Sequence, residues 1–118
     1  MRNILALSII ITAVTNFTFA QSKVFDNLKM NSEILDMERN YSVYLPPDYE
    51  TSSRSYPVLY LLHGLGDDHT GWVQFGEVKK IADNSILNGD ATPMIIIMPD
   101  ANTGYVGYIN IPSENWLY

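Results

Sequence analysis

Two short stretches of this chain are apolar without interruption, and a third alternates between apolar and polar residues. Residues 58–62 and 94–98 are the unbroken runs, and a proline directly precedes each of them. Because such runs have strand length and no polar face, they predict parallel strands buried on both sides. Residues 35–45 instead alternate with a period of two, which predicts a strand with one buried and one exposed face.

The pattern between the two apolar runs is that of a helix. Apolar residues recur at helical spacing through 78–86 with polar residues on the opposite side, and Asn88-Gly89 is a typical helix stop. A weaker alternation over 24–30, ended by a turn at Asn31-Ser32, predicts a strand near a sheet edge. The succession predicts two antiparallel strands followed by a βαβ unit, and therefore an α/β fold.

The first twenty residues have the composition of a secretory signal peptide. Arg2 gives a positive start, residues 4–14 are largely apolar, and Thr18-Phe-Ala20 places small residues where a signal peptidase reads them. The apolar stretch is shorter than the roughly 20 residues that span a bilayer, which argues against a membrane anchor. We expect 1–20 to be a signal peptide and 21–118 to belong to one secreted or periplasmic domain, with no membrane partner after cleavage.

The composition limits which ligands and which catalytic groups this chain can have. The 118 residues include 13 Asp and Glu against 7 Lys and Arg, a formal net charge of -6, and no cysteine. An acidic chain argues against nucleic acid as a partner, because that binding depends on basic clusters. The lack of cysteine excludes disulfides, thiolate metal sites and a cysteine nucleophile, so any nucleophile must be an oxygen.

A glycine-rich turn directly after the first apolar run is the main candidate site. It consists of His63, Gly64, Leu65 and Gly66. Ligands of open α/β sheets bind at the carboxyl ends of strands, and glycines let another group approach the main chain closely. Acyl transfer from an ester builds negative charge on the carbonyl oxygen, which a backbone N–H at such a turn stabilises. The N–H of Leu65 is the candidate oxyanion donor.

Other ligands fit this turn less well. The G-x-G-x-x-G dinucleotide fingerprint is incomplete because His69 stands at the third glycine position, and no Walker pattern is present. A metal site from the two histidines with Asp67 and Asp68 is conceivable, but spacing within one short loop is not diagnostic. The aspartates better fit a solvated loop face or a helix N-terminus. We therefore predict neither a metal nor a cofactor.

Several blocks of this sequence resemble the putative-esterase family of α/β-hydrolases in their order and spacing. They are YSVYLPPDY at 41–49, YPVLYLLHGLGD at 56–67, GW at 71–72, IIIMPD at 95–100 and ENW at 114–116. The family includes S-formylglutathione hydrolases, feruloyl and acetyl-xylan esterases of carbohydrate esterase family 1, and mycolyltransferase antigens. The resemblance implies an α/β-hydrolase sheet, mostly parallel with antiparallel N-terminal strands, over essentially the whole chain after residue 20.

The resemblance also implies a serine nucleophile on a G-x-S-x-G elbow, followed by an acid and a histidine base. No G-x-S-x-G occurs in the 118 residues, and the two histidines, His63 and His69, both precede the family's position for the elbow. We therefore expect the amino-terminal half of an esterase that is inactive by itself. The two histidines are expected to be structural, with His63 hydrogen-bonded to hold the turn and His69 exposed.

Position by position, the resemblance makes the Leu65 N–H an oxyanion donor and Gly64 the residue that leaves room for it. Asp100 and Tyr105 are weaker candidates for lining the substrate pocket. Export and the likeness to feruloyl esterases favour a sugar ester, as a small molecule or on a polysaccharide, although the family also contains thioester hydrolases and acyltransferases. The alternative is a non-catalytic carbohydrate-binding or interaction module, or a decayed gene product, on the same scaffold.

Overall fold

The computed structural model describes residues 20–101 and Tyr108. In this part of the chain the elements are β1 Lys23–Ser32, β2 Met37–Leu45, β3 Val58–Tyr60, α1 Gly71–Gln74, α2 Val78–Leu87 and β4 Ile95–Pro99. The four strands form one sheet in the order β1-β2-β4-β3. β2 pairs antiparallel with both β1 and β4, whereas β3 and β4 are parallel. The α/β fold with antiparallel N-terminal strands and a βαβ unit is thus confirmed.

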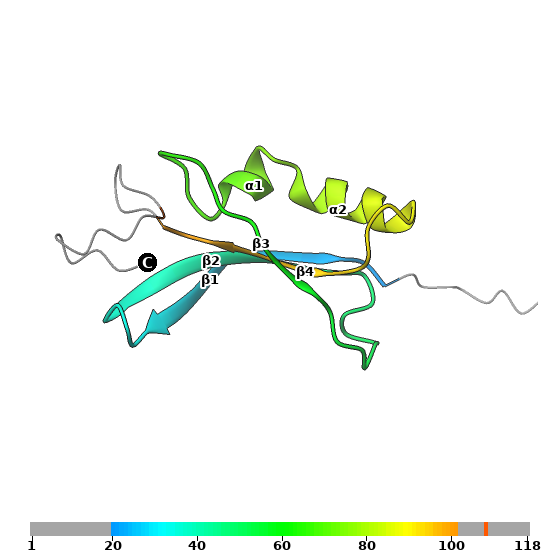
Figure 1. The fold of residues 1–118 in the computed structure, drawn as a ribbon, viewed down its shortest axis with the longest axis horizontal. Coiled ribbons are helices and arrows are strands. Elements are labelled where there is room, and N and C mark those ends of the chain that lie inside the picture. Colours follow the sequence, from blue (N-terminus) through cyan, green and yellow to red (C-terminus); the bar gives the residue numbers. More distant parts are fainter. Residues whose placement is uncertain (1–19, 102–107, 109–118) are drawn as a thin grey trace, which may run out of the picture.

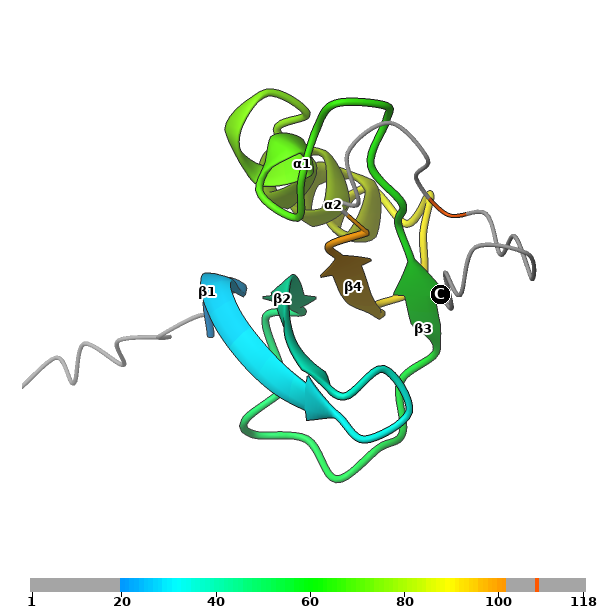
Figure 2. The same cartoon turned by 90° about the vertical axis from the view of Figure 1, so that its left-hand side faces the viewer.

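Both helices lie on one face of the sheet (Figure 1), and the end-on view in Figure 2 shows the same layering. The core between the layers contains Tyr44 of β2, Val78 of α2, and Ile96 and Met98 of β4. This packing follows from the helical spacing predicted over 78–86, because that spacing places the apolar side chains of α2 on the side that faces the strands. No helix among the described residues is long and apolar enough to cross a membrane.

The β1–β2 hairpin turns later than predicted. Asn31 and Ser32 still belong to β1, and the turn occupies residues 33–36. Asp36 has a left-handed backbone conformation with φ of 49°, and the Ser32 hydroxyl accepts the Leu35 N–H at 3.2 Å. Aspartate tolerates this conformation better than most residues, so the turn forms at Asp36.

The predicted alternation is present in β2, but the face that was expected to be exposed is buried at the carboxyl end of the strand. Ser42 and Tyr44 are both fully buried. The Tyr44 hydroxyl donates to Asp83 of α2 at 2.9 Å, and Ser22 and Lys79 donate to the same carboxylate at 2.8 and 2.7 Å. Burial and the Asp83 carboxylate raise the pKa of Tyr44. Burial alone would raise the pKa of Asp83, but hydrogen bonds from Lys79, Ser22 and Tyr44 outweigh it and lower that pKa.

β3 is not the doubly buried strand that its apolar sequence predicted. Val58, Leu59 and Tyr60 are 49%, 43% and 67% exposed. The strand lies at the edge of the described sheet, where β4 is its one hydrogen-bonded neighbour. A strand is buried on both faces only where other elements cover both faces, so an apolar run cannot guarantee burial by itself.

Candidate active-site turn

The turn from His63 to Gly66 lies where β3 leaves the sheet, at the same edge as the carboxyl end of β4. Gly66 has φ of +79°, a conformation that favours glycine, and the Asp67 N–H closes the turn on the Gly64 carbonyl at 3.2 Å. Gly64 does not use this freedom, because its φ is not positive. Apart from its two chain neighbours, no described residue has an atom within 4 Å of a Cβ added at Gly64. The space beside this residue is therefore open.

His63 connects the turn to the segment that follows β4. Its side chain is almost completely buried. The ring Nε2 accepts the Ala101 N–H at 3.0 Å, and Nδ1 lies 2.9 Å from the Gly64 carbonyl oxygen. Since Nε2 is an acceptor, the proton of the neutral ring belongs on Nδ1, where it is donated to Gly64. The imidazole therefore fixes the Gly64 carbonyl relative to the end of β4.

Asp100 lies beside this histidine, directly after β4. One carboxylate oxygen is 3.8 Å from His63 Nε2 and the other is 3.5 Å from His69 Nδ1. The expectation that His69 is exposed was wrong, because its side chain is only 12% exposed. The loop after β3 folds back so that this ring faces Asp100. The other predicted pocket residue, Tyr105, lies outside the described residues.

Tyr108 also belongs to this cluster, and the sequence did not single it out. Its hydroxyl donates to the Pro99 carbonyl at 2.8 Å and accepts the His63 N–H at 3.4 Å. The two rings lie 5.1 Å apart. Burial raises the pKa of Tyr108 despite the His63 N–H bond, and the charge of Asp100 adds to the rise. Tyr108 lies in a stretch without hydrophobic periodicity, so its aromatic character was the one sequence feature that could have marked it as a site residue.

The two acidic residues of the loop are used to shape it. Asp67 accepts the Asp68 N–H at 2.9 Å, and Asp68 accepts both the N–H and the hydroxyl of Thr70 at 2.7 Å. These bonds from Thr70 lower the pKa of Asp68. Within the described part of the chain, no group of three or more histidine or acidic side chains could hold a metal ion. The two aspartates therefore stabilise the loop that leads into α1.

Leu65 occupies the tip of the turn. It is exposed, and its N–H makes no hydrogen bond to any of the described residues. Gly64 on its amino-terminal side has no side chain, and the position that a Cβ would take there is clear of the other described residues. A backbone donor that is both unused and held on a fixed turn is available to an incoming oxygen atom.

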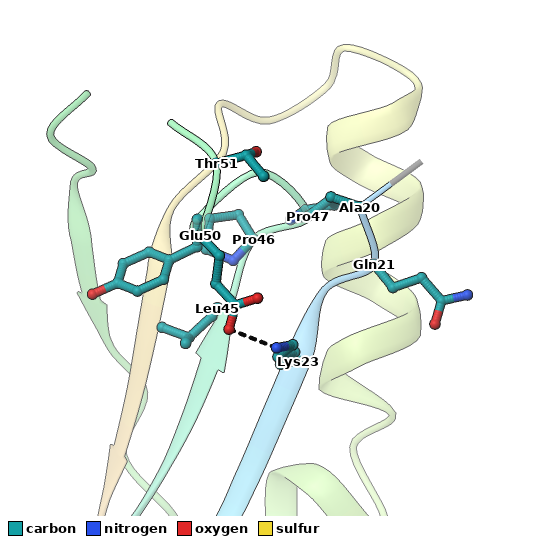
Figure 3. A pocket seen from close by; sticks show the side chains of 9 residues that line it. Ala20, Gln21, Lys23, Leu45, Pro46, Pro47, Glu50 and Thr51 are labelled. Carbon is teal, nitrogen blue, oxygen red and sulfur yellow. Dashed lines mark hydrogen bonds and ion pairs between the residues drawn. The ribbon is translucent and has the colours of Figure 1, made fainter. Parts of the chain in front are cut away.

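A separate hollow of about 130 Å³ lies at the other end of the sheet, beside the start of β1. Figure 3 shows Ala20 and Gln21 next to the Pro46-Pro47 segment, and the ion pair from Lys23 to Glu50 at 2.6 Å across it. The two charged side chains are largely exposed. The hollow contains none of the candidate residues, and a surface ion pair of this kind contributes little to stability.

A model of the family described as "Putative esterase" matches residues 32–116. The chain belongs to the putative-esterase family. The matched range includes the turn, the carboxyl end of β4 and Trp116, and the resemblance noted from the sequence is confirmed. The described sheet and the order of its strands fit the α/β-hydrolase fold of the solved relatives.

Similar proteins include several feruloyl esterases. An endo-1,4-beta-xylanase/feruloyl esterase of Xylanibacter ruminicola is 38% identical over 71 residues, which are 57% of this chain and 10% of that protein. A solved ferulic acid esterase is 37% identical with a TM-score of 0.71, covering 78% of this chain and 37% of the other. A ferulic acid esterase of Anaeromyces mucronatus, solved with ferulic acid, is 28% identical with a TM-score of 0.59, covering 86% and 36%. The chain thus spans a tenth of that curated relative and just over a third of these solved chains.

Proposed function

We propose that this chain is part of a secreted serine esterase that hydrolyses carboxylic esters of sugars, of the feruloyl or acetyl type, through an acyl-serine intermediate. Membership of the putative-esterase family supports ester hydrolysis. The substrate class is supported by the relatives, one of which is named a xylanase/feruloyl esterase and another of which was solved with ferulic acid.

The open N–H of Leu65 is the observation that carries this proposal. When a nucleophile attacks the ester carbonyl, the oxygen becomes negatively charged, and a donor that is already in place stabilises it without reorganisation. Leu65 would supply this donor, and Gly64, with no side chain, would leave room for the ester. His63 would act as a positioning residue, since its ring fixes the Gly64 carbonyl against the segment after β4.

The nucleophile, acid and base are proposed to come from residues outside these 118. Without them the chain would not turn over an ester, because an oxyanion donor alone provides only a small part of the rate enhancement. The carboxyl edge of β3 and β4 would form one side of the pocket. Asp100 and Tyr105 would line it, and the position of Asp100 beside the turn supports its inclusion.

Secretion is proposed from residues 1–20. The position of Ser22 supports this boundary, because this residue is buried and its hydroxyl donates to Asp83 at 2.8 Å. Ser22 is thus the first buried residue in the described part of the chain, two residues after the proposed cleavage point at Ala20. Amino-terminal sequencing of the exported protein tests the proposal, and a mature chain that retains residues 1–20 would contradict it.

Replacement of the Leu65 N–H tests the catalytic proposal. Leu65→Pro removes the donor, whereas Leu65→Ala keeps it and serves as the matched control. In the natural exported polypeptide that carries these residues, Leu65→Pro should lower kcat for a methyl ferulate or aryl acetate ester by about 10²- to 10³-fold. Leu65→Ala should retain most of the activity, and circular dichroism should show that both variants are folded.

Two results would overturn the proposal. If Leu65→Pro hydrolysed the ester as fast as Leu65→Ala, the Leu65 N–H would not be the oxyanion donor. If the natural polypeptide bound feruloylated xylo-oligosaccharides but hydrolysed none of the esters, the chain would belong to a non-catalytic binding module. Its intact mass should be measured at the same time, since a complete single-domain α/β enzyme has a mass of about 25–30 kDa.

A further inference from the structure

Gln21 is the residue that becomes the amino terminus if the leader is removed after Ala20. Any inference about this terminus therefore rests on the secretion proposed above. Gln21 is exposed, and its side chain makes no hydrogen bond to another residue of the described part of the chain. Figure 3 shows this side chain pointing away from the ion pair between Lys23 and Glu50. The carboxamide of Gln21 is therefore free to turn toward its own backbone nitrogen.

Ser22, the next residue, is held in place. It is buried, and its hydroxyl donates to Asp83 of α2 at 2.8 Å. The same carboxylate accepts hydrogen bonds from Tyr44 and Lys79 at 2.9 and 2.7 Å. The anchored part of the chain therefore begins directly after Gln21, and a chemical change at Gln21 leaves the contacts of Ser22 intact.

We propose that Gln21 is a modification site at which the new amino terminus cyclises to pyroglutamate. The neutral α-amino nitrogen of Gln21 attacks Cδ of its own carboxamide, and the bond that forms closes a pyrrolidinone ring. The bond between Cδ and the carboxamide nitrogen breaks. That nitrogen leaves as ammonia, with the proton that the amine gives up. The step is a transfer of the acyl group from one nitrogen to another, so it requires no oxidant, reductant or other co-reactant.

The ring protects the start of β1 from proteolysis. Chain termini are common sites of proteolytic attack, and aminopeptidases recognise a free α-amino group, which pyroglutamate lacks. Removal of Gln21 and then Ser22 would delete one of the hydrogen bonds to Asp83, and with it the side-chain link from this end of the chain to α2. Cyclisation of Gln21 therefore preserves the contact that Ser22 makes.

Mass spectrometry of the natural exported polypeptide that carries these residues tests the proposal, because a cyclised terminus blocks stepwise chemical sequencing. Proteolytic cleavage after glutamate releases an amino-terminal peptide that ends at Glu33. The mass of this peptide should be lower than that of the encoded sequence from Gln21 by one molecule of ammonia. Reductive methylation should label only Lys23 and Lys29 in it, because the cyclised terminus carries no reactive amine.

Gln21→Asn is the matched control. Asparagine carries the same carboxamide on a side chain that is one methylene shorter, so the corresponding ring is too strained to form. The peptide of this variant should have its encoded mass, and its terminus should be methylated together with the two lysines. If the parent peptide began at Gln21 and kept its amine, cyclisation would be wrong and the proposed secretion would stand. If the peptide began before Gln21, the proposed cleavage point would be wrong, and this inference would fail with it.

Exopeptidase digestion tests the protective role. An aminopeptidase should shorten the Gln21→Asn variant several-fold faster than the parent polypeptide, as followed by intact mass. Pyroglutamyl peptidase, which removes the cyclised residue, should make the parent susceptible as well. Equal rates of shortening before that treatment would show that the terminus of the parent is not protected by a ring.

Discussion

β3 and β4 are parallel neighbours with almost equally apolar sequences, yet they lie in different environments. In β4, Met98 is fully buried and Ile96 nearly so, whereas the three residues of β3 are exposed. β4 has a strand on each side and α2 above it, but β3 has one neighbouring strand in the described sheet. The difference teaches that an apolar run predicts a strand, while its neighbours decide how deeply that strand is buried.

The largest expected difference concerns the buried and edge strands themselves. Met98→Ala creates a cavity in the core and should lower the free energy of unfolding by about 2–5 kcal/mol. Leu59→Ala in β3 should cost clearly less, because nearly half of that side chain is already in water. Urea unfolding of both variants measures the difference. Equal losses would mean that β3 is as tightly packed as β4.

Two glycines of the loop after β3 also differ in how closely their surroundings are packed. Gly71 is buried at the start of α1, and a Cβ there would overlap the Asp67 carboxylate. Gly71→Ala should therefore destabilise the protein by about 1–3 kcal/mol, the usual cost of overpacking. Gly64→Ala in the open turn should leave thermal stability nearly unchanged. If Gly64→Ala lowered the melting temperature more than Gly71→Ala, the described packing of this loop would be wrong.

The smallest of these effects concerns the partly buried hydrogen-bond cluster around Asp83 of α2. The folded state lowers the pKa of Asp83, so its ionised form stabilises the fold above pH about 4, and this stabilisation is lost as pH falls below that value. Asp83→Asn should cost about 1–2 kcal/mol at neutral pH through weaker hydrogen bonds to Tyr44 and Ser22.

The pH dependence of the free energy of unfolding should differ between a variant of this cluster and a variant of the exposed β1–β2 hairpin. Asp83→Asn should flatten the loss of stability between neutral pH and pH 3, as followed by urea midpoints. Glu38→Gln serves as the control, since Glu38 pairs with Lys29 at the surface of the β1–β2 hairpin. An identical acid slope for Asp83→Asn and the parent chain would show that the Asp83 carboxylate does not titrate with folding.

Most of the elements that surround the candidate site could be predicted from local patterns in the sequence. The helical stripe over 78–86 and the Asn88-Gly89 stop correspond closely to α2, and the apolar run at 94–98 differs from β4 by one residue. The turn at 63–66 was recognisable because glycines follow an apolar run. The positions of His69 and Tyr108 were not accessible, since each contacts residues that are distant in the sequence.

The sequence by itself determined the family, because several blocks of residues resemble it in order and spacing. It also determined the order of the elements and the candidate turn, because these depend on periodicity and on residues close together in the chain. Tertiary structure decided which sides of β2 and β3 are covered, which residues donate hydrogen bonds to Asp83, and how His63 joins the ends of two strands. These outcomes depend on the packing of α2 and on pairing across the sheet. Contacts between distant residues leave no local period, so only the folded chain reveals them.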